Sequence, residues 1–263
     1  AACSLWLTEQ GINHDRVFCD TGWEHPLTYE YLRGPLTAKL GPIVEVRAPL
    51  GMVELVRKKA MFPSRRRRFC TEELKVRPMQ KHLAALQDTG LEIINATGVR
   101  AAESEARAQL PEWEWQEAFD CETWRPLIHA TEAEVIMLHK RHGLAPNPLY
   151  LKGATRVGCW PCIHARKAEI KLWAQLDPQR VALVRELEEE LTAAARARNP
   201  NAGRRGFFQA PVPDAPGRIP AWGIDQIVEW SGIAQSAFDF PEADAGCMRW
   251  GICDTGTKAG GES

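Results

Sequence analysis

Two cysteines with two residues between them, Cys159 and Cys162 in the segment GCWPCIHARK, are the residues of this chain best suited to do chemistry. In a protein from a reducing compartment, thiols at this spacing are typical of a metal site, an iron–sulfur cluster or a redox dithiol. Further thiols at Cys70, Cys247 and Cys253 can supply the remaining ligands of a four-thiolate site. The spacing by itself leaves all three chemistries open.

Positive charge close to these thiols favours the thiolate form that binds metal. Arg68, Lys75, Arg156 and Lys167 provide such charge along the sequence. A thiolate-bound cluster, a zinc site with four cysteine ligands, a dithiol couple and inert buried cysteines are the competing interpretations. His164 can replace one thiolate, although a single histidine is more often a hydrogen-bonding residue of a helix.

The remaining cysteines of the first half, Cys3, Cys19 and Cys121, each stand alone in a predicted helix, strand or loop. We expect them to be chemically inert. The tryptophans of segment 113–124 can stack on a nucleotide base, but packing in the core or in a lid is the simpler expectation.

Two polar turns and a run of arginines are candidates for binding an anionic ligand. Asp20, Thr21 and Gly22 follow a predicted strand, where a carboxylate can accept from ribose hydroxyls and a glycine admits a ligand close to the backbone. Taken alone, this sequence also fits a plain turn. Arg100 follows another predicted strand, and arginines 65–68 can bind phosphate or sulfate or form a solvated basic loop.

Strand and helix patterns alternate through residue 143, which predicts parallel strands covered by helices. The expected strands are 16–19, 43–46, 91–94 and 126–129. The expected helices of this part are 26–35, 52–61, 71–86 (with a break or restart at Pro78), 101–108 and 131–143. Charged helices at 163–198, a loop rich in proline and glycine at 199–220 and a short helix at 224–230 follow.

Composition places this chain among soluble globular proteins. It has 263 residues, 44% hydrophobic and 25% charged, with a net charge of −1 at pH 7. That balance gives no overall field toward nucleic acid or a membrane. No transmembrane run or signal peptide is evident, and eight scattered cysteines do not resemble a secreted disulfide scaffold, so we expect a cytoplasmic protein.

Five segments, in order, give the chain a specific resemblance to the phosphoadenosine phosphosulfate (PAPS) reductase family, within the adenine-nucleotide α-hydrolase (PP-loop) superfamily. They cover roughly residues 1–165, and such an ordered set is a far stronger signal than a single Cys-x-x-Cys. The segments are FCDTGWEHPLTYEYL, RFCTEELKVRP, TGVRAAES, RPLIHATEAEV and NPLYLKGATRVGCWPC.

The resemblance implies an α/β fold, a Rossmann-like parallel sheet of five strands flanked by helices, that binds an adenine nucleotide at the strand ends. It places Asp20, Thr21 and Gly22 beside the nucleotide and Arg100 beside its phosphate or sulfate. We add Arg68 and Lys75 to the nucleotide-binding set. The expected domains are a reductase-like part, residues 1–165, and a helical and irregular C-terminal extension, residues 166–263.

Members of the family that carry a [4Fe–4S] cluster hold it with cysteines placed like Cys70, Cys159 and Cys162. They supply two adjacent cysteines at the first position, whereas this chain has Phe69 before Cys70. The fourth ligand is therefore expected elsewhere, at Cys253 or Cys247, and zinc is the alternative metal.

Two further departures concern the ends of the chain. The family's phosphate-binding loop, of the form SGGKDS, and the strand before it are expected upstream of Ala1, so the chain reads as cropped and its sheet is expected to have a gap. The tail GICDTGTKAGGES has no ECG-type motif with a catalytic cysteine, and Cys253 is the conceivable analogue.

The leading hypothesis is a sulfonucleotide reductase that binds PAPS or adenylyl sulfate beside a [4Fe–4S] cluster and takes electrons from a thiol donor such as thioredoxin. Cys253 would be its nucleophile, and Arg100 and the loop 65–68 would stabilise the anionic substrate. One alternative is an ATP-dependent sulfurtransferase of the DNA-phosphorothioation or tRNA-thiolation type, which would also bind nucleic acid. Another is a non-catalytic binding module with a Cys₄ zinc site.

Overall fold

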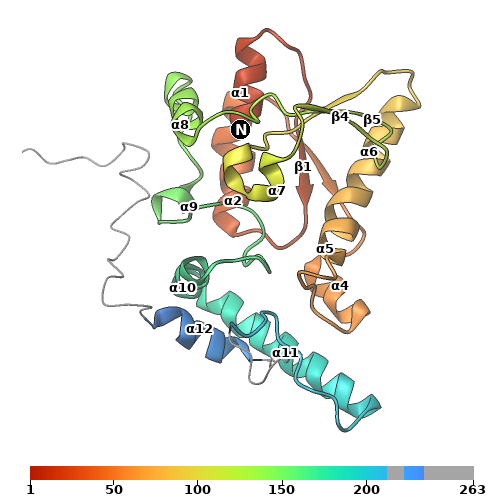
Figure 1. Ribbon diagram of the computed structural model, residues 1–263, viewed down its shortest axis with the longest axis vertical. Helices are drawn as coiled ribbons and strands as arrows, with labels where there is room; N and C mark the ends of the chain where they lie inside the picture. The colour runs from red at the N-terminus through yellow and green to blue at the C-terminus, as the bar shows by residue number, and fades with distance from the viewer. Residues whose placement is uncertain (212–221, 234–263) are drawn as a thin grey trace, which may run out of the picture.

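A computed structural model describes residues 1–211 and 222–233 of the chain. Short strands lie near the middle of the molecule, with helices on both sides and a separate group of helices along one end (Figure 1). Strands and flanking helices alternate through the first half, so the predicted α/β class with parallel strands is confirmed. Within the described residues, no helix is long and apolar enough to cross a membrane.

The first sheet contains two parallel strands, β1 (Val17–Asp20) and β2 (Val44–Arg47). Both predicted strands are therefore confirmed, each shifted by one residue. The crossover between them consists of α2 (Pro26–Tyr31), a π-helix (Leu32–Leu36) and α3 (Thr37–Leu40). Asp20 is the last residue of β1 and stands beside Arg47 in the register, so the strand delivers its carboxylate to the carboxyl end of the sheet.

The second sheet contains three strands in the order β3–β5–β4, with bounds Ile94–Ala96, Cys121–Trp124 and Trp113–Gln116. β3 and β5 are parallel, and β4 is antiparallel to β5. The resemblance implied one five-stranded parallel sheet with a gap. The described strands instead form two sheets, one of which is mixed.

The strand predicted at 126–129 is wrong. These residues form a turn after β5, in which Ile128 N–H donates to Arg125 O and Ala130 N–H donates to Leu127 O. Pro126 has no N–H to give to a sheet ladder. Leu127 and Ile128 are nevertheless buried, so an apolar run that looks like a strand serves as a core-facing turn.

Helices flank these sheets on both sides. On one side, α1 (Ala2–Glu9) packs against α8 (Glu132–Arg141), which begins at a capping box formed by Thr131 and Glu134. On the other side, α4 (Met52–Lys59) precedes the arginine loop, and α5 (Phe69–Thr71), a π-helix (Glu72–Val76) and α6 (Arg77–Gln87) follow it. Pro78 lies in the first turn of α6, which confirms the predicted restart. The remaining short helices are a 3₁₀ turn (Ala101–Glu103), α7 (Glu105–Ala108) and α9 (Pro148–Leu151).

Three helices at the C-terminal end, α10 (Lys167–Leu176), α11 (Pro178–Arg198) and α12 (Ile224–Gly232), form the group at one end of the molecule (Figure 1). They share one apolar core with the first half. Trp23 and Leu149 belong to the same buried cluster as Trp173 and Leu187. The domain boundary at residue 165 remains a prediction, and the core is continuous across it.

Candidate functional site: a thiol cluster beside the end of β1

The turn that ends β1 holds two buried carboxylates in a network of donors. Asp20 accepts from the Gly22 N–H at 2.8 Å, and Glu24 accepts from the Thr21 hydroxyl at 2.7 Å. Gly22 adopts φ +66°, and a Cβ there would lie 3.1 Å from Arg47 Nη2, so glycine suits the position on both counts. Arg47 Nε lies 3.4 Å from Asp20 Oδ2 and partly offsets its charge.

Tyr29, one turn into α2, links the two carboxylates. Its hydroxyl lies 2.6 Å from Asp20 Oδ1 and 2.9 Å from Glu24 Oε2. Burial raises the pKa of Tyr29, and both carboxylates raise it further, so the phenol stays protonated and donates. The site therefore contains two residues, Glu24 and Tyr29, to which sequence reasoning assigned no role, although both lie in the first motif segment.

The Cys-x-x-Cys turn is hydrogen-bonded directly to this turn. Trp160 N–H donates to Trp23 O at 2.8 Å, and Trp23 Nε1 donates to Pro161 O at 3.0 Å. Glu24 and Cys159 also form an isolated antiparallel bridge. Residues far apart in the sequence are thus held together by backbone contacts, which bring the paired cysteines to the carboxyl end of β1.

Cys70, Cys159 and Cys162 are all half-buried and lie close enough to influence one another electrostatically. Burial raises the pKa of Cys159, and the neighbouring Cys162 and Cys70 raise it further while Lys75 opposes them. Burial likewise raises the pKa of Cys70, with Cys162 adding to the effect. The three thiols that the sequence singled out therefore influence one another, and their role as ligands of one centre stays a prediction.

Lys75 connects the thiols with the carboxylate network. Burial acts to lower the pKa of Lys75, but the charge of Cys159, a hydrogen bond to that thiol and the charge of Glu24 outweigh it and raise the pKa. The ammonium group thus interacts favourably with both the Cys159 thiol and the Glu24 carboxylate. It supplies the positive charge that thiolates need.

Sulfur donors of this kind are the ligands that zinc and iron–sulfur clusters take, and Lys75 balances part of their charge. In donor type and charge, the three cysteines fit a thiolate-bound centre. Among the residues that the structure describes, no three histidine, cysteine or acidic side chains are grouped tightly enough to hold a metal ion themselves. Cys247 and Cys253, the candidates for a fourth ligand, lie outside the described residues.

Arg100 follows β3 and is largely covered, with 17% of its side chain exposed. Its Nε lies 3.6 Å from Glu103 Oε1, whereas its Nη1 is buried and has no hydrogen-bond partner within the described part of the chain. The Thr97 hydroxyl, in the same turn, is also buried and also has no hydrogen-bond partner within the described part of the chain. A buried donor without a partner needs an explanation, and an anionic ligand at this turn would provide one.

The arginine loop, residues 65–68, is exposed and lies near the thiol turn. Burial lowers the pKa of His164, and Arg68, Arg65 and Arg156 lower it further, which places these guanidinium groups around the residue. The His164 N–H donates to Cys162 Sγ at 3.5 Å. Arg68 also contacts the Thr71 hydroxyl at 3.4 Å. The thiol turn therefore receives positive charge from the arginines as well as from Lys75.

Other candidates lie outside this cluster. Cys121 is buried in β5, and Cys19 contacts the carbonyl oxygen of Lys75 at 3.8 Å. Trp113 and Trp115 are 44% and 58% exposed, so packing in the core is wrong for these two residues, while packing in a lid stays a prediction. Trp113 stacks on Trp124 with 5.0 Å between ring centroids.

The fold and the site together define an α/β protein with cysteines beside the end of its first strand. Residues 4–165 match the phosphoadenosine phosphosulfate reductase domain. The match covers more than half of the chain, and the chain belongs to the phosphoadenosine phosphosulfate reductase family.

Several known proteins are similar to this chain. An uncharacterized 37.8 kDa protein of Escherichia phage 186 is 36% identical over 247 residues, which cover 74% of this chain and 73% of that protein. The adenosine 5′-phosphosulfate reductase of Allochromatium vinosum is 34% identical over 99 residues, which are 38% of this chain and 36% of that enzyme. The corresponding Burkholderia cepacia enzyme is 36% identical over 99 residues, 38% of this chain and 37% of the enzyme. The chain thus spans little more than a third of these two reductases.

Among solved structures, the phosphoadenylyl-sulfate (PAPS) reductase from Candida auris, in a phosphate complex, is similar with a TM-score of 0.47. It is 23% identical and covers 61% of this chain and 76% of its own.

Proposed function

We propose that this protein is a sulfonucleotide reductase that binds PAPS or adenylyl sulfate at the end of β1, beside a cysteine-bound [4Fe–4S] cluster. The observation that carries the proposal is the hydrogen-bonded junction of Trp23 with Trp160 and Pro161. Through this junction, the thiol turn stands next to the Asp20 turn, where the family's nucleotide is expected. We also propose a cytoplasmic location, where thiol reductants keep such cysteines reduced.

In this proposal, Asp20, Thr21 and Gly22 position the ribose and Arg100 binds the phosphate or sulfate. The buried Nη1 of Arg100 lacks a partner among the described residues, and a charge-assisted hydrogen bond to an oxyanion would satisfy it. Lys75, which interacts with Glu24 and Cys159, adds positive charge beside the sulfate.

Cys70, Cys159 and Cys162 would hold the cluster, with Cys253 or Cys247 as the proposed fourth ligand. When bound, an iron–sulfur cluster supplies a redox-active centre whose potential depends on nearby charge and hydrogen bonds. Lys75 interacts with Cys159, and the His164 N–H donates to Cys162 Sγ. These two groups would therefore influence the reduction potential of the cluster.

The proposed reaction proceeds through a cysteine thiolate, for which Cys253 is the candidate, and in that case Cys247 would be the fourth ligand of the cluster. The thiolate attacks the sulfur of the sulfate group and the bond from that sulfur to the phosphate oxygen breaks, which releases the nucleotide and leaves S-sulfocysteine. A thiolate of a thioredoxin-type dithiol then attacks the cysteine sulfur, and sulfite leaves. The second donor thiol resolves the mixed disulfide, so the donor is oxidised and the cysteine regenerated.

The cluster assignment is tested by anaerobic purification followed by iron, sulfide and zinc analysis. Cys159→Ser and Cys162→Ser are each expected to lose the visible absorbance and the bound iron, because each removes a thiolate ligand. Cys121→Ser is the control and is expected to keep both, since Cys121 lies buried in β5. Stoichiometric zinc without sulfide would contradict the cluster.

The reaction is tested by sulfite release from PAPS or adenylyl sulfate in the presence of thioredoxin. Arg100→Gln is expected to reduce kcat/KM by about tenfold or more, because it removes a charged hydrogen bond to the oxyanion. Arg107→Gln is the control, since Arg107 also contacts Glu103 but is exposed. Release of pyrophosphate from ATP without any sulfite would favour sulfur transfer and sink the reductase proposal.

A further inference from the structure

The second sheet leaves much of one face uncovered. In its register, Trp115, Glu122 and Ile94 lie side by side across β4, β5 and β3, and directly paired residues project from the same face. Trp115 is 58% exposed and Ile94 is 52% exposed. Trp113 lies on the same face, is 44% exposed and stacks on Trp124. This face therefore leaves two tryptophans and an isoleucine largely uncovered by the described residues.

β4 is also an edge strand, because no other described strand pairs with its outer side. Arg125 N–H donates to Glu112 O, so these two residues extend the antiparallel ladder as a hydrogen-bonded pair. The alternation of such pairs along the ladder then turns the backbone groups of Trp113 and Trp115 toward the outer edge. An extended peptide can pair there, and its side chains opposite the two tryptophans would lie on the same face.

The residues around this face carry negative charge. Segment 112–125 contains five acidic residues and one basic residue, Arg125. The acidic residues are Glu112, Glu114, Glu117, Asp120 and Glu122. Arg125 pairs with Glu114 at 2.5 Å, whereas Glu122 forms no ion pair with any residue that the structure describes. Glu122 is exposed, so a positively charged partner can reach its carboxylate.

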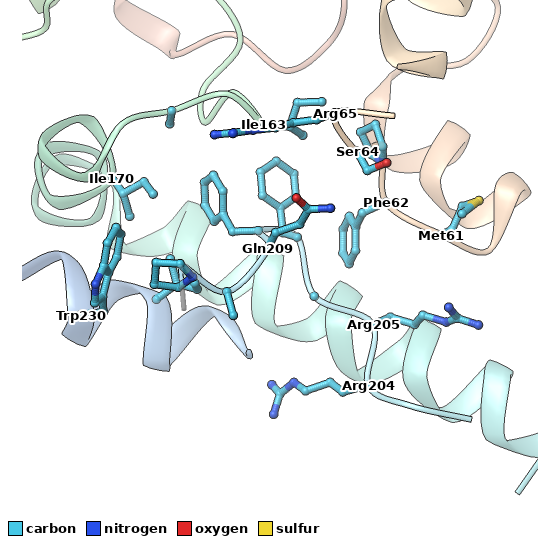
Figure 2. Close-up of a pocket in the computed structure, with 18 residues that line it drawn as sticks. Met61, Phe62, Ser64, Arg65, Ile163, Ile170, Arg204, Arg205, Gln209 and Trp230 are labelled. Carbon is cyan, nitrogen blue, oxygen red and sulfur yellow. The ribbon is translucent and has the colours of Figure 1, made fainter. Parts of the chain in front are cut away.

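A concentration of positive charge lies elsewhere in the molecule. A cavity of about 530 Å³ between the arginine loop and α12 is lined by Arg65, Arg204 and Arg205, and its described lining contains no acidic residue (Figure 2). β4 and β5 lie at the other end of the molecule from α11 and α12 (Figure 1). The arginines of the cavity therefore do not neutralise the carboxylates around β4.

This charge selects the kind of partner that fits. Exposed tryptophans can stack on nucleotide bases, but unpaired carboxylates repel the phosphates of a nucleic acid. A guanidinium group is attracted both by the face of a tryptophan ring and by a carboxylate. Trp115 and Glu122 offer both attractions within one cross-strand pair.

We propose that the edge of β4 binds an extended, arginine-bearing segment of a partner protein by strand addition. Backbone groups of Trp113 and Trp115 pair with the added strand, and its alternate arginines lie over the tryptophan rings beside Glu122. No residue of this surface belongs to the proposed nucleotide or cluster site, so the proposal does not depend on reductase activity.

The test is fluorescence anisotropy of a labelled peptide, a capped octapeptide of alternating threonine and arginine, titrated with the anaerobically purified full chain. Trp115→Ala and Glu122→Gln are each expected to raise its Kd about threefold or more, since each removes an attraction for the guanidinium group. Met137→Ala and Glu189→Gln are the matched controls, because they remove an exposed apolar side chain and an exposed carboxylate from other elements.

Two altered peptides separate charge from strand pairing. Replacement of the arginines by glutamates should abolish binding, because like charges then meet at the acidic face. N-methylation of the arginine amides keeps every charge but removes the N–H groups that would pair with β4. It should therefore raise the Kd about tenfold or more.

The proposal is overturned by the absence of binding at millimolar concentration, by equal binding of either altered peptide, or by equal losses in the control variants. Two further results would give the face to another occupant and overturn it as well. One is a dimer of the chain alone in sedimentation that Trp115→Ala dissociates. The other is binding of single-stranded DNA that the same substitution removes. Because the measurement requires no turnover, failure of the reductase proposal would leave its result intact.

Discussion

Lys75 interacts with two parts of the site that share one chemical need. The carboxylates at the end of β1 need a positive charge nearby, and the thiols need one to become thiolates. One ammonium group, that of Lys75, interacts with both Glu24 and Cys159. Its removal should therefore change the thiols even when no ligand is bound.

We predict that Lys75→Met raises the pKa of Cys159 in metal-free protein. Lys75 opposes the rise in this pKa that burial causes, so without it the thiolate forms only at higher pH. The measurement is the rate of alkylation by iodoacetamide against pH, followed by mass spectrometry of the peptide that carries Cys159. The profile should move to higher pH in Lys75→Met and stay in place in Lys81→Met, an exposed lysine on α6. An unmoved or lowered profile in Lys75→Met would refute this role.

At the scale of elements, α11 organises the chain that follows it through Glu188. This carboxylate receives two backbone N–H groups and Arg204, although it is fully buried. Burial raises the pKa of Glu188, and the three donors act in the opposite direction. The hydrogen bonds from these donors to Glu188 hold the segment 204–208 and the start of α12 against α11.

We predict that Glu188→Ala destabilises the protein by about 3 kcal/mol, because buried donors and Arg204 lose their acceptor. Glu188→Gln is expected to lose less, since its amide oxygen still accepts. Urea unfolding gives the free energies, and exposed Glu189→Ala should remain within about 0.5 kcal/mol of the parent. A loss for Glu188→Ala no larger than that for Glu189→Ala would show that this acceptor does not hold the segment.

Local patterns were sufficient for most elements but not for the second sheet. The alternation Trp-Glu-Trp-Gln forms β4, yet its tryptophans face solvent, so it gave no core signal. The buried run at 127–128 has the apolar pattern of a strand but forms a turn. The turn between β4 and β5 is held by Gln80 and Gln87 of α6, which donate to backbone oxygens of residues 118–120. Because these donors lie on a helix distant in the sequence, the local sequence of the two strands does not predict the turn.

In the candidate site, too, some residues could be predicted from the sequence and others could not. Residue type and spacing single out Cys70, Cys159 and Cys162 as ligands, and this role stays a prediction. The roles of Glu24 and Tyr29 were not predictable, because they arise only when α2 turns back over the end of β1. Motif resemblance identified the right segments, and only the packing shows which side chains within them meet.

At the scale of the whole molecule, stability is tied to pH through a histidine far from the thiols. His139 on α8 is 6% exposed, and burial lowers its pKa to about 4. Protonation is therefore disfavoured in the folded state. Stability from this residue is fully present above the unfolded pKa of about 6.5 and is lost as pH falls toward 4.

We predict that the free energy of unfolding falls by up to about 3 kcal/mol between pH 6.5 and 4 because of His139 alone. His139→Leu should lose this part of the pH dependence, whereas His129→Leu, which changes an exposed histidine, should keep it. Urea unfolding at several pH values measures both. If the slope in His139→Leu equalled that of the parent, another group would have to be its source.

The junction between Trp23 and Pro161 joins residues 138 positions apart. During synthesis, the β1 turn leaves the ribosome long before the cysteine pair exists, so no complete thiol site can form until Cys162 has been added to the nascent chain. In the proposed cluster, Cys70 would therefore be made before the other two ligands. Assembly of any centre at these thiols is consequently a late event in biogenesis, dependent on the cell's reducing capacity and on the arrival of the last segment.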